Sequence, residues 1–521
     1  MTMRKKSIAM TLAAVAAAAV MTLSACAGAA TGTSESNGKP QAGGDITIAR
    51  SADVVSLLPT AVGDNPSIWT QELLYEPLLK PKPDGSGVQP WLAKSYTVSK
   101  DLKTWTLKLQ QGVKFSDGST MTSKDVKWSL ERASQKDAQY ESYNEPISAI
   151  AIPDDSTVVI TLKQAWAPFA ATLALFSNAI IPANYGGKSA DQFNKRPVGT
   201  GPFTLGSWVK GQYIKLLKNK HYWQKGKPYL NSVTFTTVND ATTRLTQVKS
   251  GEIDVDEAPA YSSMAAIKSA GGDLKVGDWK SGHTDYLTMN NTYGPLKDVH
   301  VRRAISYAID RKAIVSNVLY GYGEAATSYM PTNIWSHIDA GEKYDMAKAK
   351  KELAQSGKYA KGFSVELLTE SGNDDHKAVA QIIQASLKKL NIDVTIKTTD
   401  PTTIEDTESS GEFQMGFVYR TPDVIDPDQF IRYSDGRRTS HALYSNYMNT
   451  ALSPMYENGA AQASKADREK IYAQIQKIAT NDAFVATLYY SPSTAILSSK
   501  VHGYSTGSVG EYSMADTWIE H

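Results

Sequence analysis

Cysteine and long apolar segments are scarce in this sequence. Cys26 is the only cysteine among 521 residues. A single cysteine excludes an intramolecular disulfide and a thiolate metal cluster. After residue 23 no segment approaches the roughly 20 apolar residues that a membrane-spanning helix needs. We therefore expect a globular protein that is stabilised by packed cores rather than by covalent cross-links.

The sequence also lacks an excess of charge of either sign. Lys and Arg total 55 and Asp and Glu total 53, which gives a formal charge of +2. Residues 1–25 contain three basic residues and no acidic one, so without them the charge is −1. This balance gives no electrostatic reason to expect a nucleic-acid partner. The remaining 496 residues exceed what one hydrophobic core supports, which predicts more than one lobe.

The N-terminus has the pattern of an export signal. Basic residues at 4–6 precede an apolar stretch at 8–23, and "LSAC" follows at 23–26. This order is typical of a signal peptide, which we assign to residues 1–25. The stretch resembles a bacterial lipobox, which implies a lipid on Cys26 and an anchor on the extracytoplasmic face of the cell membrane. Residues 26–44 are rich in Gly, Ser and Thr and are predicted to be a flexible tether.

The first half of the chain contains both helix and strand patterns. We predict a strand at 43–51 and a helix at 68–79. From residue 81 apolar and polar residues alternate between Gly/Asp turns, which indicates antiparallel strands, with one helix at 122–134 capped by Thr122 or Ser123. Pro and Gly then crowd an irregular crossing at 196–208.

The second half has the pattern of an α/β sheet. A helix is predicted to start at the cap Asp298 and to stop at Gly321. A strand at 363–369, a helix at 374–390 and a strand at 392–397 form a βαβ unit, which implies a parallel sheet. A further strand at 413–419 precedes "TPDVIDPDQF", residues 421–430. Ligands bind beyond the carboxyl ends of such strands, so we expect this segment at a ligand crevice.

Catalytic and metal-binding patterns are weak. "GYSTG" at 503–507 matches a nucleophile elbow, but only 14 residues follow it and His521 is their sole histidine. No histidines have zinc spacing, and Asp254 and Asp256 lack the Gly-containing, Glu-closed loop of a calcium site. No nucleotide fingerprint is present. We therefore predict that the chain is not an enzyme and has no cofactor or metal site.

Three carboxylates in "TPDVIDPDQF" need an explanation. Asp426 precedes a proline and is a natural turn residue, and Asp428 is predicted to cap the turn that follows. Asp423 has no structural role visible in the sequence. It is either a solvated surface acid or a charge that meets a ligand.

Several motifs in order carry a family resemblance, among them "LYEPLLKPKPDG", "GVKFSDGSTMTSKDV", "PVGTGPFTLGSW", "VRRAISYAIDRKAI" and "DPDQF". The chain resembles the family 5 extracellular solute-binding proteins of ABC importers. The resemblance implies a two-lobe, type II periplasmic-binding-protein-like α/β fold. Lobe I would comprise 43–75, 196–284 and 500–521, with 76–195 as an extra β-rich domain, and lobe II would be 285–499.

The resemblance further implies a monomeric, lipid-anchored receptor that captures short peptides between its lobes and delivers them to ABC permease subunits. An oligosaccharide, an opine or a metal chelate is the alternative ligand. In peptide-binding relatives the acid at the position of Asp423 holds the ligand's ammonium. Arg420 and Phe417 depart from the residues of these relatives, so the partner of the ligand's carboxylate stays open. The predicted ligand-binding residues are Asp423, Arg420, Asn65 and Tyr419.

Overall fold

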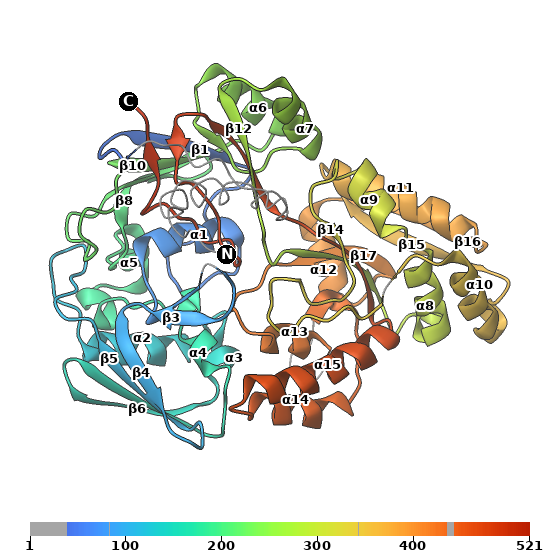
Figure 1. Ribbon diagram of the computed structural model, residues 1–521, viewed down its shortest axis with the longest axis horizontal. Coiled ribbons are helices and arrows are strands. Elements are labelled where there is room, and N and C mark those ends of the chain that lie inside the picture. The colour runs from blue at the N-terminus through green and yellow to red at the C-terminus, as the bar shows by residue number, and fades with distance from the viewer. Residues whose placement is uncertain (1–38, 83, 342, 435–441) are drawn as a thin grey trace, which may run out of the picture. The chain divides into compact units, whose positions relative to one another are not determined.

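Two large sheets and a smaller antiparallel sheet carry the fold (Figure 1). The structure is a computed structural model that describes residues 39–82, 84–341, 343–434 and 442–521. The predicted signal peptide, Cys26 and the tether up to residue 38 lie outside the described residues. Among the described helices, none combines the length and the apolar character needed to cross a bilayer.

The first sheet forms the base of lobe I. Its strand β1 lies between β10 and β11 and is parallel to both, while its other neighbouring strands are antiparallel. In spatial order its strands are β12 (Leu274–Trp279), β19 (Ser493–Ser498), β11 (Val255–Asp256), β1 (Asp45–Arg50), β10 (Ser232–Thr237), β9 (Tyr213–Lys218) and β8 (Phe203–Val209). The helices associated with it are α1 (Asn65–Leu74), α5 (Ala190–Lys195), α6 (Ala241–Ser250) and α7 (Tyr261–Ala270).

The segment predicted to be β-rich forms the smaller sheet, which confirms its antiparallel pattern. Its order is β4 (Ala93–Val98), β5 (Thr104–Leu109), β7 (Thr157–Leu162) and β6 (Ile147–Asp154). Helix α2 (Ser123–Ala133) packs on β6 and β7, and its cap is Thr122, whose N–H donates to Asp125 Oδ2 at 2.7 Å. The short elements around this sheet are β2 (Leu79–Pro81), β3 (Val88–Pro90), α3 (Glu141–Asn144) and α4 (Phe169–Thr172).

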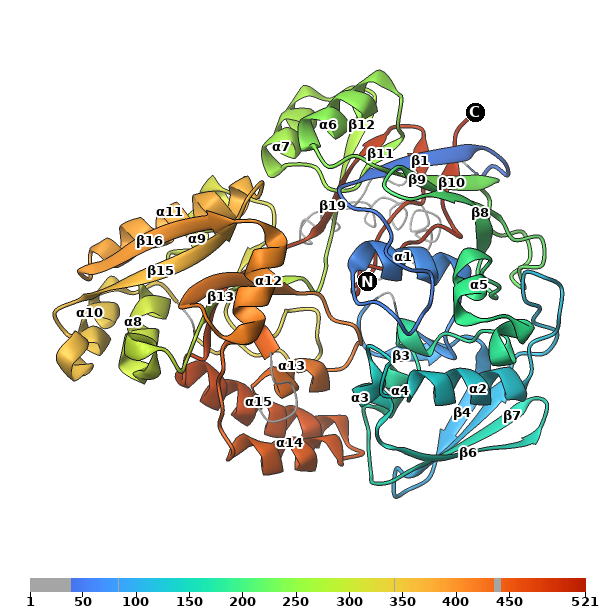
Figure 2. The same cartoon turned by 180° about the vertical axis from the view of Figure 1, so that it is seen from behind.

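The second sheet forms the base of lobe II. Its order is β14 (Glu324–Ala325), β18 (Val485–Tyr490), β13 (Thr284–Met289), β17 (Met415–Arg420), β15 (Phe363–Glu370) and β16 (Ile392–Thr399). Strands β15 and β16 are parallel and joined by α11 (Asp374–Lys388), which confirms the predicted βαβ unit. The other helices of this part are α8 (Val299–Ala308), α9 (Arg311–Asn317), α10 (Met346–Gln355), α12 (Pro401–Ser410), α13 (Asp428–Tyr433), α14 (Leu452–Ala460) and α15 (Lys465–Asn481). Figure 2 shows α11 beside β16, and α12 packs against β15.

Two predicted helices have different bounds in the structure. The helix predicted at 68–79 is α1, which begins earlier because the Asp64 side chain accepts a hydrogen bond from Ser67 N at 2.9 Å. It ends at Leu74, shortly before Pro77, since a residue that precedes proline avoids helical geometry. The single helix predicted to run to Gly321 is instead α8 and α9, because Asp310 caps a new helix by accepting from Ala313 N.

The chain crosses between the two large sheets twice, at 280–283 and at 491–492. Ser491 N donates to His283 O at 3.1 Å, so the two crossings are hydrogen-bonded to each other. Strand β19 follows the second crossing and pairs with β11 and β12 of the first sheet. The boundary predicted at 499 therefore lies too late, because β19 belongs to lobe I.

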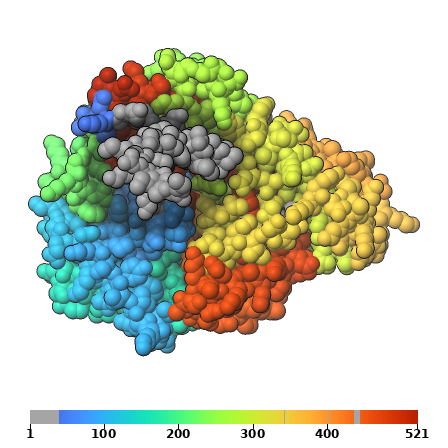
Figure 3. All heavy atoms as spheres, in the orientation of Figure 1, coloured from blue at the N-terminus to red at the C-terminus, as the bar shows by residue number. Residues whose placement is uncertain are grey.

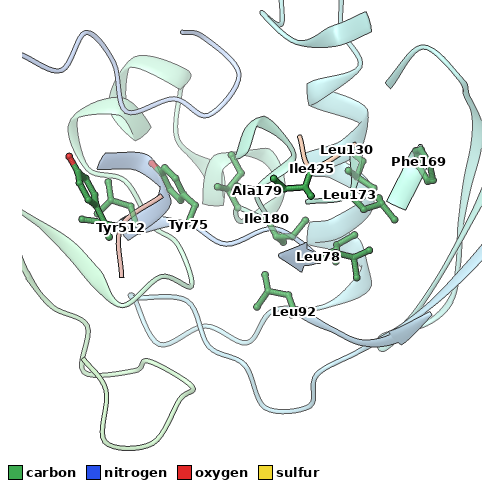
Figure 4. Close-up of a cluster of buried hydrophobic side chains, with 14 of the residues drawn as sticks. Tyr75, Leu78, Leu92, Leu130, Phe169, Leu173, Ala179, Ile180, Ile425 and Tyr512 are labelled. Atoms are coloured by element: carbon green, nitrogen blue, oxygen red, sulfur yellow. The ribbon is translucent and has the colours of Figure 1, made fainter. Parts of the chain in front are cut away.

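Apolar contacts join lobe II to the β-rich part of the chain. Ile425, which follows β17, belongs to the same buried cluster as Leu130 and Leu173, and Figure 4 shows these side chains together. Its neighbour Val424 belongs to a separate buried cluster with Ile68 of α1. On the face shown in Figure 3, the orange-red residues that carry α14 also adjoin the blue residues of the smaller sheet.

The crossing at 196–208 packs against the end of α1. Gly201 N donates to Leu74 O at 3.0 Å. A Cβ atom on Gly199 would lie 2.1 Å from Leu74 O and 2.5 Å from Tyr75 Cδ1. The "GTG" of the motif therefore allows two backbone segments to touch, and this contact fixes the C-terminal end of α1.

We expect Gly199→Ala to destabilise the protein by about 1–3 kcal/mol or more, because the added methyl group meets backbone that cannot move aside. Urea unfolding followed by circular dichroism measures the change. Ser207→Ala, on exposed β8 surface, is the control and should shift the free energy of unfolding by less than about 0.5 kcal/mol. Equal unfolding midpoints for the two variants would contradict the close-packing argument.

Candidate ligand-binding site

The segment 421–428 leaves the carboxyl end of β17, next to the parallel strand β15. This is the edge of the second sheet at which we expected a ligand crevice. The segment carries Asp423, Asp426 and Asp428, and the structure gives the three carboxylates different surroundings.

Asp426 shapes the turn, as predicted. Its two oxygens accept hydrogen bonds from Arg468 at 2.5 and 2.9 Å, and its Oδ1 also accepts from Asp428 N at 2.9 Å. The side chains of both partners are less than a tenth exposed. A two-point arginine–carboxylate pair of this kind fixes orientation as well as position.

Asp428 does not cap the turn, and that prediction is wrong. It is the first residue of α13, and its carboxylate is directed to other side chains. Oδ2 accepts from Arg432 Nε and from the Tyr456 hydroxyl, both at 3.1 Å, and Oδ1 accepts from the Tyr472 hydroxyl at 3.1 Å. Asp428 is therefore a buried structural acid that joins α13 to α14 and α15.

Asp423 has polar neighbours but no cation in contact. Gln429 Nε2 donates to Asp423 Oδ2 at 2.6 Å, and Gln429 Oε1 accepts from Asp423 N at 2.9 Å. The hydroxyls of Tyr140 and Tyr143 lie 3.4 and 3.5 Å from the two carboxylate oxygens. Within the described part of the chain no ion pair involves Asp423.

Burial changes the acidity of Asp423. The loss of solvent raises the pKa of its carboxyl to about 6, although the charge of Arg420 and the hydrogen bond from Gln429 act in the opposite direction. The Asp423 carboxyl is therefore mostly ionised at pH 7, and the buried negative charge costs free energy because it has lost solvent. A cation that reached it would relieve that cost.

Asp423 lies on a pocket that both lobes line. The lining residues come from α1, from the β-rich part, from the segment after β17 and from the C-terminal loop, and they are Asn65, Ile68, Trp69, Glu72, Phe176, Thr421, Pro422, Asp423 and Val509. One carboxylate of lobe II thus faces the amide, aromatic and acidic side chains of α1.

The structure brings two of the four predicted site residues together. Asn65, the first residue of α1, and Asp423 line the same pocket. Arg420 and Tyr419 are not among its described lining residues. The Tyr419 ring is 47% exposed and stacks on His283 with 4.7 Å between centroids. The Arg420 guanidinium lies over the Tyr444 ring at 5.5 Å.

Other residues of the site were missed from the sequence. Gln429 stands inside the motif itself, but nothing in the sequence shows that it holds both the backbone and the carboxylate of Asp423. Tyr140 and Tyr143 are spaced to lie on one side of a helical turn, which was a usable signal for a shared role. Their distance of about 280 residues from Asp423 in the chain hides the contact.

The side chains of the rejected motifs have protein partners. The Ser505 hydroxyl donates to Ser513 Oγ at 3.0 Å rather than to a histidine. Asp254 accepts from Thr47 N at 2.8 Å, and Asp256 pairs with Arg244 at 2.9 Å. Among the described residues no group of three or more His, Cys, Asp or Glu side chains is arranged to hold a metal ion.

Comparison with known proteins agrees with this geometry. Residues 87–441 match the family described as bacterial extracellular solute-binding proteins, family 5 Middle. The probable D,D-dipeptide-binding periplasmic protein DdpA of Escherichia coli K12 is 29% identical over 472 residues, which cover 88% of this chain and 91% of DdpA.

Solved structures match over most of the chain. DppA of Helicobacter pylori, in complex with the peptide STSA, has a TM-score of 0.82 and 28% identity, over 92% of this chain and 99% of that chain. AgaA of A. tumefaciens R10, in complex with agropinic acid, has a TM-score of 0.79 and 29% identity, over 92% and 99%. These matches confirm the predicted family and two-lobe fold. The chain belongs to the bacterial extracellular solute-binding proteins, family 5, the binding components of ABC transporters, and is not an enzyme.

Proposed function

We propose that this protein is a lipid-anchored receptor that captures short peptides between its two lobes and delivers them to an ABC permease. The observation that carries the proposal is Asp423, a half-buried carboxylate that forms no ion pair with a described residue, on a pocket that both lobes line. A peptide's α-ammonium has the charge and the hydrogen-bond donors that this carboxylate lacks.

The relatives support a peptide as the ligand, but peptides are not the only class of ligand in the family. The H. pylori structure contains the peptide STSA, and DdpA is named for D,D-dipeptides. AgaA contains agropinic acid. The proposed site therefore has to be tested on the ligand's amine, because an uncharged sugar can donate hydroxyl hydrogen bonds to Asp423 but has no cation to pair with it.

Binding would be coupled to closure of the lobes. The pocket takes residues from α1 on one side and from the segment after β17 on the other. Closure is favoured only by ligand contacts that the open state does not make. The Asp423–ammonium contact together with the contacts to α1 meets this condition, and the two crossings at 280–283 and 491–492 are the places for hinge motion.

We expect Asp423→Asn to weaken binding of a free tripeptide about a hundredfold or more, because a buried ammonium loses its counter-charge. Asparagine keeps the size of the side chain. N-acetylation of the peptide should weaken wild-type binding to a similar extent, with little further loss in Asp423→Asn. Isothermal titration calorimetry on the four combinations measures this coupling.

Asp393→Asn is the matched control, since Asp393 forms an exposed ion pair with Lys388, and it should bind as the wild type does. Equal binding of free and acetylated peptides to the wild type would show that Asp423 holds no ammonium. Binding of agropinic acid or of an oligosaccharide without any peptide binding would change the ligand class.

The affinity should also depend on pH. With a pKa of about 6 in the free protein, Asp423 is ionised at pH 7 and mostly protonated at pH 5. A bound ammonium favours the ionised form, so peptide affinity should fall about tenfold from pH 7 to pH 5. Asp423→Asn removes the carboxyl group but keeps His283 and the nearby tyrosines, so its peptide affinity should not fall between pH 7 and pH 5. A tenfold fall in the variant as well would show that another group causes the pH dependence.

The anchor is testable apart from the pocket. We expect the wild type to incorporate labelled palmitate in a bacterial host and to fractionate with membranes, because a diacylglyceryl group on Cys26 supplies the two chains that stable anchoring needs. Cys26→Ser should incorporate no label. Labelling of that variant at the wild-type level would show that Cys26 is not the lipidated residue.

A further inference from the structure

Glu72 stands between two pockets. It projects from α1 into the wall of the pocket that contains Asp423. It also lines a second pocket, whose other walls include Glu511, Tyr222, Tyr512, Trp91 and Lys80. Glu72 therefore shares one pocket with Asp423 and borders the other.

One carboxylate oxygen of Glu72 lacks a partner among the described residues. Its Oε2 is shielded from solvent and forms no hydrogen bond with a described residue. Burial first and the like charge of the Glu511 carboxylate second raise the pKa of Glu72 to about 8. Glu511 itself receives a hydrogen bond from Val509 N at 3.2 Å, and burial raises its pKa.

The other charged groups of the second pocket interact with protein side chains. Glu76 accepts from Trp91 Nε1 and Trp223 Nε1, both at 2.9 Å, and from the Tyr222 hydroxyl at 3.1 Å. Asp516 pairs with Lys227. The charge of Lys80 opposes the shift of Glu72, but its Nζ lies over the Trp91 ring at 4.7 Å, and in the described chain it forms no ion pair with Glu72 or Glu511.

We propose that Glu72, with Glu511 behind it, binds the cationic side chain of the ligand's first residue. This inference rests on the proposed function and gives the ligand class as peptides that begin with lysine, ornithine or arginine. If Asp423 holds the α-ammonium, the side chain nearest to that amine is the first one, and Glu72 lines the same pocket. A cation there would supply the partner that Glu72 Oε2 lacks.

The test compares lysyl-alanyl-alanine with norleucyl-alanyl-alanine, which has a similar chain without the charge. At pH 8 the wild type should bind the lysyl peptide about ten- to a hundredfold more tightly, the range of one charge-assisted hydrogen bond. Alanyl-alanyl-lysine has the same composition, but its cation is at the far end, so it should bind like the norleucyl peptide. Glu72→Gln should remove the lysyl preference and still bind the norleucyl peptide.

Proton release gives a second readout. At pH 7 Glu72 is mostly protonated in the free protein, and a bound cation favours its ionised form. Calorimetry in two buffers of different ionisation enthalpy should detect proton release for the lysyl peptide beyond that for the norleucyl peptide. Glu511→Gln removes the like charge, so less release is expected at pH 7. In Glu72→Gln the excess release should disappear.

The two proposals fail in different ways. Equal affinities of the lysyl and norleucyl peptides for the wild type, or a lysyl preference that persists in Glu72→Gln, would overturn the cationic subsite and leave the peptide receptor standing. Absence of binding by all three peptides would overturn both. Asp393→Asn serves again as the control, and thermal unfolding of each variant shows whether it is folded.

Discussion

Asp426 and Arg468 form a buried two-point ion pair that fixes the segment after β17, and the candidate site depends on that segment. A buried pair of this kind costs roughly 3–5 kcal/mol when one partner is removed, because the other charge is stranded. Asp428 is held in the same way by Arg432 and two tyrosines. Both of these acids pair with arginine, whereas Asp423 forms no ion pair with a described residue.

The residues between these acids attach the segment to the opposite side. Val424 packs with Ile68 of α1, and Ile425 enters the large cluster that contains Leu130 and Leu173. Apolar burial holds the backbone of the segment against lobe I while its ion pairs hold it to lobe II. The segment that carries Asp423 therefore contacts both lobes.

His283 links this site to the crossings between the sheets. Its Nε2 lies 3.4 Å from Asp285 Oδ2, its Nδ1 lies 3.3 Å from Thr421 Oγ1, and its ring stacks on Tyr419. Ser491, on the other crossing, donates to the same Asp285 carboxylate at 2.5 Å. One polar cluster thus joins both crossings to the start of the segment that carries Asp423.

Local patterns in the sequence determined the βαβ unit, the antiparallel strands of residues 81–195 and the family, and they singled out Asp423 as a candidate ligand-binding acid. These features depend on residues close together in the chain, whose periodicity and turn chemistry are visible there. The break between α8 and α9 was missed, because Asp310 reads equally well as part of a helix and as a cap. The predicted role of Asp428 was wrong, because its partners Tyr456 and Tyr472 are distant in sequence.

Only the tertiary structure decided which strand belongs to which sheet and which side chains share the pocket. Tyr140, Glu72 and Val509 reach Asp423 or its pocket from segments that meet only when the lobes pack, and that packing depends on long-range burial that no local pattern encodes.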